Sequence, residues 1–151
     1  MNFPILSVTL FAPLVGALLI LVIPREDVKT IRRVGTAFAF LTLVFTIIIW
    51  VNVAQSGQGS MQLEENLPWI DAFSIRYHIG VDGLSAPLLF LTALLTTLVT
   101  FYSSYAIDVR VKEYYFLFLL LEMGMTGVFI SLDFFLFYVF WEIGLVPMFL
   151  L

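Results

Sequence analysis

The chain has 151 residues, of which 62% are hydrophobic and 12% charged, and its mean hydropathy is +1.06. Soluble domains carry about 25% charged and 45–50% apolar residues, so this composition excludes a water-soluble globule and predicts a membrane protein. The net charge of −4 argues against a nucleic-acid-binding protein, which needs a concentrated basic surface. With no cysteine and a single histidine, the chain offers no thiolate or poly-histidine site, and no metal is expected.

Five apolar segments are expected to cross the bilayer, whose core of roughly 30 Å needs about 20 residues per helix. In a single membrane domain of residues 1–151, they are expected at residues 3–23, 34–53, 84–106, 114–131 and 133–151. The last two belong to one apolar run of 38 residues, which would reach about 57 Å as one helix and is too long for one crossing. Ser131 and Asp133 mark the expected break, because their side chains can cap a helix start. The sequence therefore predicts an all-α, polytopic bundle of about five transmembrane helices.

The basic residues predict the orientation, because Lys and Arg accumulate in cytoplasmic loops. Five crossings place six of the seven basic residues on one side of the membrane and leave Arg76 on the other. The six are Arg25, Lys29, Arg32, Arg33, Arg110 and Lys112. The amino terminus is therefore expected outside the cell.

The outer connection at residues 54–81 is the one sizeable polar segment. In it Phe73, Ile75 and Tyr77 alternate with polar residues, a period of two that suits a half-buried strand. Two interpretations stay open, a loop lying on its own helices and a β-hairpin that contacts a neighbour. His78 is interpreted as a hydrogen-bonded residue of this segment rather than as a proton relay.

Two carboxylates lie in the middle of apolar spans. Glu122 is nine residues past Glu113 and Glu142 is nine past Asp133, so each lies about 13.5 Å along its helix. Since the two helices are antiparallel, both carboxyls reach a similar depth and can share one buried polar layer. An acid at the bilayer centre costs roughly 2.5 kcal/mol or more and normally faces the bundle interior.

Glu142 and Glu122 are the candidate proton-translocation residues. Desolvation disfavours a charged carboxylate and a nearby cation favours it, so a carboxyl between these effects can exchange a proton when its partner moves. No basic residue lies in an expected span, so the cation must come from another segment or subunit. The alternative for each acid is a neutral, hydrogen-bonded tie between helices.

Neighbouring residues weigh on this choice. Pro147 favours the functional interpretation of Glu142, because it frees the carbonyl of Ile143 and can open the helix to water. Beside Glu122, Gly124 and Gly127 leave both interpretations open, since small residues also allow close helix packing. The threonines of the third span, Thr92, Thr96, Thr97 and Thr100, either line a wet seam or bond their own helix.

Three stretches carry a resemblance to a known family. Trp141 and Glu142 are followed by Leu-Val-Pro-Met at 145–148, and two further motifs occupy residues 77–85 and 121–129. Together they resemble the N-terminal part of the antiporter-like subunit M family of bacterial NADH-quinone oxidoreductase, respiratory complex I. Such a resemblance implies a fourteen-helix fold of which this chain is the first part, with an outward amino terminus in the bacterial inner (plasma) membrane. The apolar end at Leu151 agrees with a fragment of a longer chain.

By the same resemblance, Glu142 pairs with a lysine two helices later and takes part in proton translocation, and Glu122 contributes secondarily. The expected function is to couple quinone reduction to proton pumping, with other membrane subunits of complex I and the lipid bilayer as partners. No cofactor and no direct NADH binding are expected, because the redox chemistry would sit in other subunits. Two alternatives remain, a subunit of a cation/proton antiporter of the same fold and a structural membrane scaffold.

Overall fold

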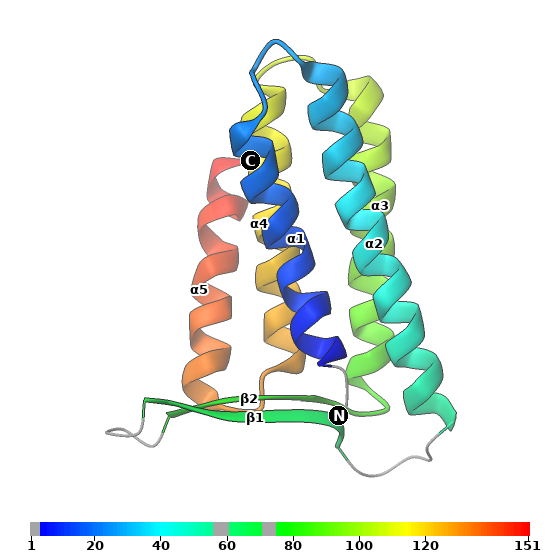
Figure 1. The fold of residues 1–151 in the computed structure, drawn as a ribbon, viewed down its shortest axis with the longest axis vertical. Helices are drawn as coiled ribbons and strands as arrows, with labels where there is room; N and C mark the ends of the chain where they lie inside the picture. The colour runs from blue at the N-terminus through cyan, green and yellow to red at the C-terminus, as the bar shows by residue number, and fades with distance from the viewer. Residues whose placement is uncertain (1–3, 56–60, 71–74) are drawn as a thin grey trace.

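The computed structural model describes residues 4–55, 61–70 and 75–151. Within them the helices are α1 (Ile5–Val22), α2 (Val28–Gln55), α3 (Ser85–Ala106), α4 (Val111–Ile130) and α5 (Phe134–Leu150). The strands β1 (Gln62–Ile70) and β2 (Ile75–Val81) form an antiparallel hairpin. The helices stand side by side and the hairpin lies across one end of the bundle (Figure 1). The outer segment is thus a β-hairpin, and its contact with a neighbour stays a prediction. Phe73, which carried part of the alternation, lies outside the described residues.

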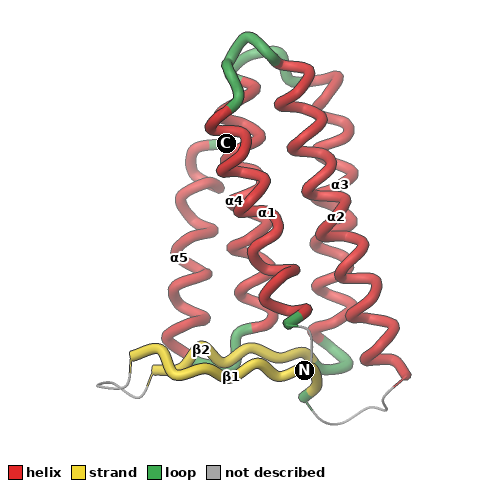
Figure 2. The backbone as a smooth tube through the Cα atoms, viewed as in Figure 1, coloured by secondary structure: helices red, strands yellow, loops and turns green. Residues whose placement is uncertain are grey.

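Length and composition agree with a multi-pass membrane protein. In the described part of the chain, α1 to α4 are each long and apolar enough to cross a membrane. α5 has 17 residues and would reach about 25 Å at 1.5 Å per residue, slightly less than the roughly 30 Å of the hydrocarbon core. It runs alongside α4 and returns from the hairpin end of the bundle (Figure 2).

Helix α2 begins at Val28, six residues before the expected start at residue 34. The Asp27 carboxylate accepts a hydrogen bond from the backbone N–H of Thr30 at 3.2 Å, which satisfies one of the free donors of the first turn. Arg32 and Arg33 therefore lie in the second turn of a helix rather than in a connecting loop. Helix α2 therefore extends beyond the expected span of residues 34–53 at this end.

The break between the last two helices lies where the sequence predicted it. α4 ends at Ile130, and the Asp133 carboxylate accepts hydrogen bonds from the N–H groups of Phe135 at 2.9 Å and Leu136 at 3.1 Å. In the same turn the N–H of Leu132 donates to the carbonyl of His78 at 2.9 Å. The second strand of the hairpin is therefore attached to the α4–α5 connection.

A second attachment joins the hairpin to the start of α1. The Glu65 carboxylate accepts hydrogen bonds from the N–H groups of Leu6 at 3.0 Å and Ser7 at 3.3 Å. The Ser7 hydroxyl bonds both Glu65 and, at 2.8 Å, the hydroxyl of Tyr77, and burial raises the pKa of Tyr77. A negative charge at a helix N-terminus is favourable, so this contact stabilises α1 and holds the hairpin on the bundle.

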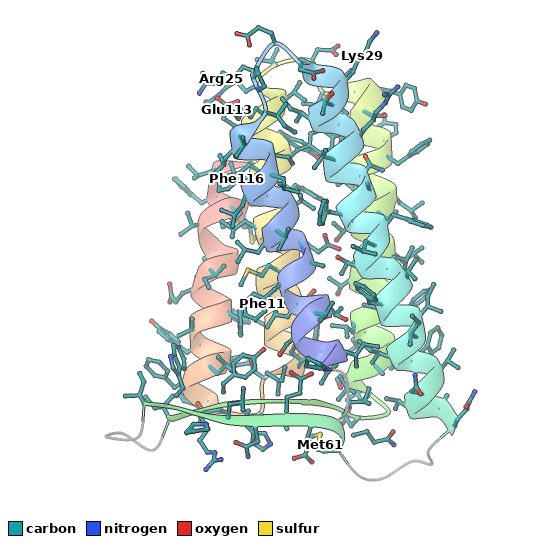
Figure 3. All side chains as sticks on the ribbon, in the orientation of Figure 1. Phe11, Arg25, Lys29, Met61, Glu113 and Phe116 are labelled. Carbon is teal, nitrogen blue, oxygen red and sulfur yellow. The ribbon has the colours of Figure 1, made fainter. Side chains whose placement is uncertain are left out.

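At the opposite end, cationic side chains bond the C-terminal carbonyls of neighbouring helices. Lys112 donates to the carbonyls of Leu21 at 2.9 Å and Ile23 at 2.7 Å, and Arg32 donates to that of Ile107 at 2.6 Å. Figure 3 shows Arg25 and Lys29 at the end of the bundle opposite Met61. The six-to-one division of basic residues thus corresponds to the two ends of the molecule, which we call the basic end and the hairpin end.

Candidate functional site

Glu122 is enclosed by the helix bundle. It lies near the middle of α4, the helix that packs against all four other helices, and it is 0% exposed. Neither of its carboxyl oxygens has a hydrogen-bond partner among the described residues. The alternative interpretation of Glu122 as a hydrogen-bonded tie between helices therefore lacks a partner in this part of the chain.

Two buried threonines of α2 lie at the level of Glu122. The apolar core consists of one cluster toward the hairpin end and one toward the basic end. On α4, Glu122 falls between Leu119 of the basic-end cluster and Met123 of the hairpin-end cluster. On α2, which packs against α4, the buried Thr42 and Thr46 fall between residues of the same two clusters. Glu122 thus shares its level in the bundle with two buried hydroxyls of α2.

Sequence reasoning did not single out Thr42 and Thr46. Their hydroxyls donate to the carbonyls of Phe38 at 3.0 Å and Leu43 at 2.8 Å, which leaves their oxygen lone pairs free to accept. Their spacing of four residues places both on one helix face. The sequence holds this signal, but it does not tell which face of an apolar helix is buried.

The hydroxyls of the third span bond their own helix. Thr92, Thr96, Thr97 and Thr100 each donate to a carbonyl three or four residues earlier, at 2.8–3.0 Å. Thr97 also donates to the carbonyl of Ala39 on α2 at 3.1 Å. Of the two interpretations of this seam, the structure favours bonding within the helix over a wet channel.

Glu142 lies at the centre of α5 on its exposed face. Its carboxylate interacts with the hydroxyl of Tyr138, one turn earlier, and the nearby Trp141 and Leu145 are exposed as well. Because α5 packs mainly against α4 and β2, one of its faces is left uncovered. Within the described residues, Glu122 is buried as expected, whereas Glu142 is exposed. The two glutamates therefore do not share a buried layer in this part of the chain.

The two glutamates nevertheless have similar depths. α4 and α5 approach each other at Gly124 and Gly144, where a Cβ on Gly124 would lie 2.9 Å from the Cα of Gly144. Each glutamate comes two residues before one of these glycines on antiparallel helices, so their levels differ by about four residues, or about 6 Å. The close approach also shows that Gly124 serves helix packing, which was one of its two interpretations.

His78 takes a structural position in the hairpin. Its Nε2 lies 3.1 Å from a carboxylate oxygen of Glu64 on the opposite strand. This confirms the interpretation of His78 as a hydrogen-bonded residue. In the ranges that the structure describes, no group of three or more His, Asp or Glu side chains is placed to hold a metal ion.

Comparison with known sequences identifies relatives along the whole chain. It is 35% identical over 150 residues to the NAD(P)H-quinone oxidoreductase chain 4 2 of Picosynechococcus sp., which covers 99% of this chain and 28% of the relative. Chain 4-2 of the Synechocystis sp. enzyme is 37% identical over 152 residues, covering 99% and 27%. The NADH-ubiquinone oxidoreductase chain 4 of Marchantia polymorpha is 34% identical over 146 residues, covering 97% and 29%. The chain thus spans less than a third of the length of these curated relatives.

Two solved structures share the fold. A chain of respiratory complex I from Thermus thermophilus with bound NADH aligns with a TM-score of 0.77 and 24% identity, covering 94% of this chain and 27% of that one. A chain of the membrane-bound sulfane sulfur reductase, an archaeal respiratory membrane complex, aligns with a TM-score of 0.81 and 21% identity, covering 96% and 29%. No protein-family profile matches the chain. Along almost its whole length, the chain is therefore similar to part of chain 4 of the NAD(P)H-quinone oxidoreductases.

Proposed function

We propose that this chain is part of a proton-translocating, antiporter-like membrane subunit of NADH-quinone oxidoreductase, in which Glu122 and Glu142 carry protons. The observation that carries the proposal is the full burial of Glu122 at mid-helix without a hydrogen-bond partner in the described structure. A buried polar group without a partner costs about 1–3 kcal/mol, so folding alone would favour an apolar residue there. Acids at this depth in membrane helices mark proton pathways.

The relatives favour this class over a cation/proton antiporter, because they are named as chains of quinone oxidoreductases. In such an enzyme the chain would contribute proton transfer, while NADH oxidation and quinone reduction would take place in other subunits. Its partners would be neighbouring membrane subunits, one of which contacts the hairpin. The enzyme activity thus belongs to the assembly, and this chain is one of its membrane parts.

For Glu142 we propose a cationic partner on a membrane segment that covers α5. The support is its exposed position at the centre of an apolar helix, where a carboxylate facing lipid would be costly. A Lys or Arg on the covering segment would favour the charged form, and its withdrawal would favour proton uptake. The surface around Tyr138 and Trp141 would then be an interface rather than a lipid contact.

We propose an orientation with the amino terminus and the hairpin outside, in the inner membrane of a bacterial cell. The support is the collection of six basic residues at the end opposite the hairpin, since basic residues remain on the cytoplasmic side.

The decisive experiment replaces each glutamate by glutamine in the complete enzyme. Glutamine keeps the size and polarity of the side chain but cannot bind and release a proton. We expect Glu142→Gln and Glu122→Gln to lower the number of protons pumped per NADH oxidised, measured together with quinone reduction in sealed vesicles. Glu142→Gln should have the larger effect.

Glu113→Gln is the matched control, because Glu113 lies on the same helix as Glu122 but at the basic end, 3.2 Å from Arg25. It should pump normally. If both Glu142→Gln and Glu122→Gln also pumped normally, the chain would be a structural scaffold and the proposal would be wrong.

A further inference from the structure

A groove of about 540 Å³ lies on the surface of the bundle between α2 and α3. Its lining includes Arg32, Arg33, Ala37, Phe40, Leu98 and Phe101. These two helices form the side of the bundle away from α5 (Figure 1), so the groove is separate from the exposed surface around Glu142.

The groove has a cationic end and an apolar end. Arg32 and Arg33 lie in the second turn of α2, near the basic end. Phe40 lies seven residues further along α2, about 10 Å deeper at 1.5 Å per residue. Phe40, Leu98 and Phe101 are 55%, 56% and 57% exposed, so their side chains offer apolar surface that nothing in the described structure covers. A positive charge at headgroup depth above apolar walls matches the chemistry of a single phospholipid.

The charges at the cationic end favour an anionic ligand. Among the described residues, no acidic side chain lines the groove. Arg32 is partly neutralised by Asp108 at 2.8 Å, whereas Arg33 is exposed and forms no ion pair among the described residues. Asp27, just before α2, interacts electrostatically with both Arg33 and Lys29, the latter one turn before Arg33. Basic pockets between membrane helices on the cytoplasmic side bind anionic headgroups.

We propose that this groove binds one anionic phospholipid. Its phosphate would lie against Arg33 and the neighbouring Arg32, and an acyl chain would pass between Phe40 and Phe101. Free phosphate would satisfy the arginines but would leave the apolar walls uncovered, and an apolar protein segment would leave Arg33 without a counter-charge. An anionic phospholipid supplies both the counter-charge for the arginines and the apolar chain that covers the walls.

The test uses the complete membrane assembly reconstituted into phosphatidylcholine vesicles that contain a small fraction of a photoactivatable lipid. This probe carries a diazirine on its acyl chain and has either a phosphatidylglycerol or a phosphatidylcholine headgroup. Mass spectrometry measures how much probe attaches to the peptide that contains residues 36–40. We expect clearly more labelling from phosphatidylglycerol.

Two variants examine the two ends of the groove. Arg33→Gln should lower labelling by phosphatidylglycerol about fivefold, the factor that corresponds to about 1 kcal/mol for one basic residue near the membrane surface. Ala37→Trp should abolish labelling of the peptide by filling the groove without changing its charge. Lys29→Gln is the matched control, because Lys29 lies one turn before Arg33 but does not line the groove, and it should leave labelling unchanged.

Four results would overturn the proposal. Equal labelling by the two headgroups would show ordinary lipid contact, and an equal loss with Lys29→Gln would show diffuse surface charge. Displacement of the probe by inorganic phosphate would show an anion site, and no labelling of this peptide by either headgroup would show that a protein segment covers the groove. None of these readouts depends on proton pumping, so they are independent of the function proposed above.

Discussion

Glu122 is the residue whose burial the fold explains least. Its side chain is fully buried inside the bundle, yet neither oxygen is bonded in the described structure. A structural tie would need a partner, whereas a proton carrier needs a site that can accept a proton and lose it again. The two roles differ in what happens to stability when the carboxyl is removed.

We predict that Glu122→Met stabilises the assembly. Methionine fills a similar volume with apolar atoms and removes a polar group that costs about 1–3 kcal/mol when buried without a partner. The apparent melting temperature of the purified enzyme should therefore rise, while proton pumping falls. Glu122→Gln keeps a polar group in the same place and should therefore not raise the melting temperature. A lower melting temperature for Glu122→Met would show that the carboxyl is a structural tie.

Asp82 supplies a second prediction at the residue scale, outside the membrane. Its carboxylate accepts hydrogen bonds from the N–H groups of Ser85 at 2.7 Å and Leu84 at 3.0 Å, and these bonds, that of Ser85 first, hold its pKa below the usual value. Its contribution to stability is therefore present above the usual pKa of about 3.9 and is lost as the pH falls through the lowered value.

Hydrogen exchange at the start of α3 measures this effect. Asp82→Ala should lower the protection of the Ser85 amide at neutral pH, by an amount matching about 1 kcal/mol for a lost helix cap. In the unaltered chain the same loss should develop only at acid pH. Protection that is identical in the variant and the unaltered chain at neutral pH would refute the capping role.

At the scale of elements, the contact between α4 and α5 depends on glycine. A Cβ on Gly124 would lie 2.9 Å from both the Cα and the N of Gly144, which are backbone atoms that cannot yield as a flexible side chain can. A Cβ on Gly144, by contrast, would meet nothing within 4 Å. The same contact is therefore sensitive on one helix and tolerant on the other.

We expect Gly124→Ala to destabilise the pairing of α4 and α5 by about 1–3 kcal/mol, the usual penalty of overpacking. The melting temperature of the assembly should fall, and proton pumping should fall with it as Glu122 and Glu142 change their relative placement. Gly144→Ala, the matched control, should behave as the unaltered protein. Equal effects of the two alanines would mean that the helices pack differently.

At the scale of the whole molecule, charge separates the two ends of the bundle. The Glu65 carboxylate accepts a hydrogen bond at the start of α1, and the Lys112 ammonium donates one at its end. The negative charge thus lies at the positive end of the helix dipole and the positive charge at its negative end, which is favourable. The same division that stabilises the helices also predicts the orientation of the chain in the membrane.

Labelling of single cysteines tests this orientation, since the chain has no cysteine of its own. Met61 and Lys29 are exposed and lie at opposite ends of the bundle (Figure 3). In intact cells a membrane-impermeant maleimide should label this chain when it carries Met61→Cys but not when it carries Lys29→Cys. Opened vesicles should label both. The reverse pattern in intact cells would place the hairpin in the cytoplasm.

The sequence by itself determined the helices, the break at Asp133 and the two charged ends. In lipid the backbone must satisfy its own hydrogen bonds, so an apolar run of sufficient length has to be helical, and its length sets the number of crossings. The sequence did not predict the early start of α2, because the basic residues Lys29, Arg32 and Arg33 are typical of a connecting loop. Asp27 nevertheless caps the first turn of a helix there.

Only the tertiary structure decided which faces of these helices are buried. Glu122 and Glu142 look equivalent in sequence, each in the middle of an apolar run, yet Glu122 is fully buried and Glu142 lies on an uncovered face. A helix that is apolar all round has no amphipathic pattern to indicate its inner face. The burial of Glu122, Thr42 and Thr46 therefore depends on which helices pack together. That packing is visible only in the folded structure.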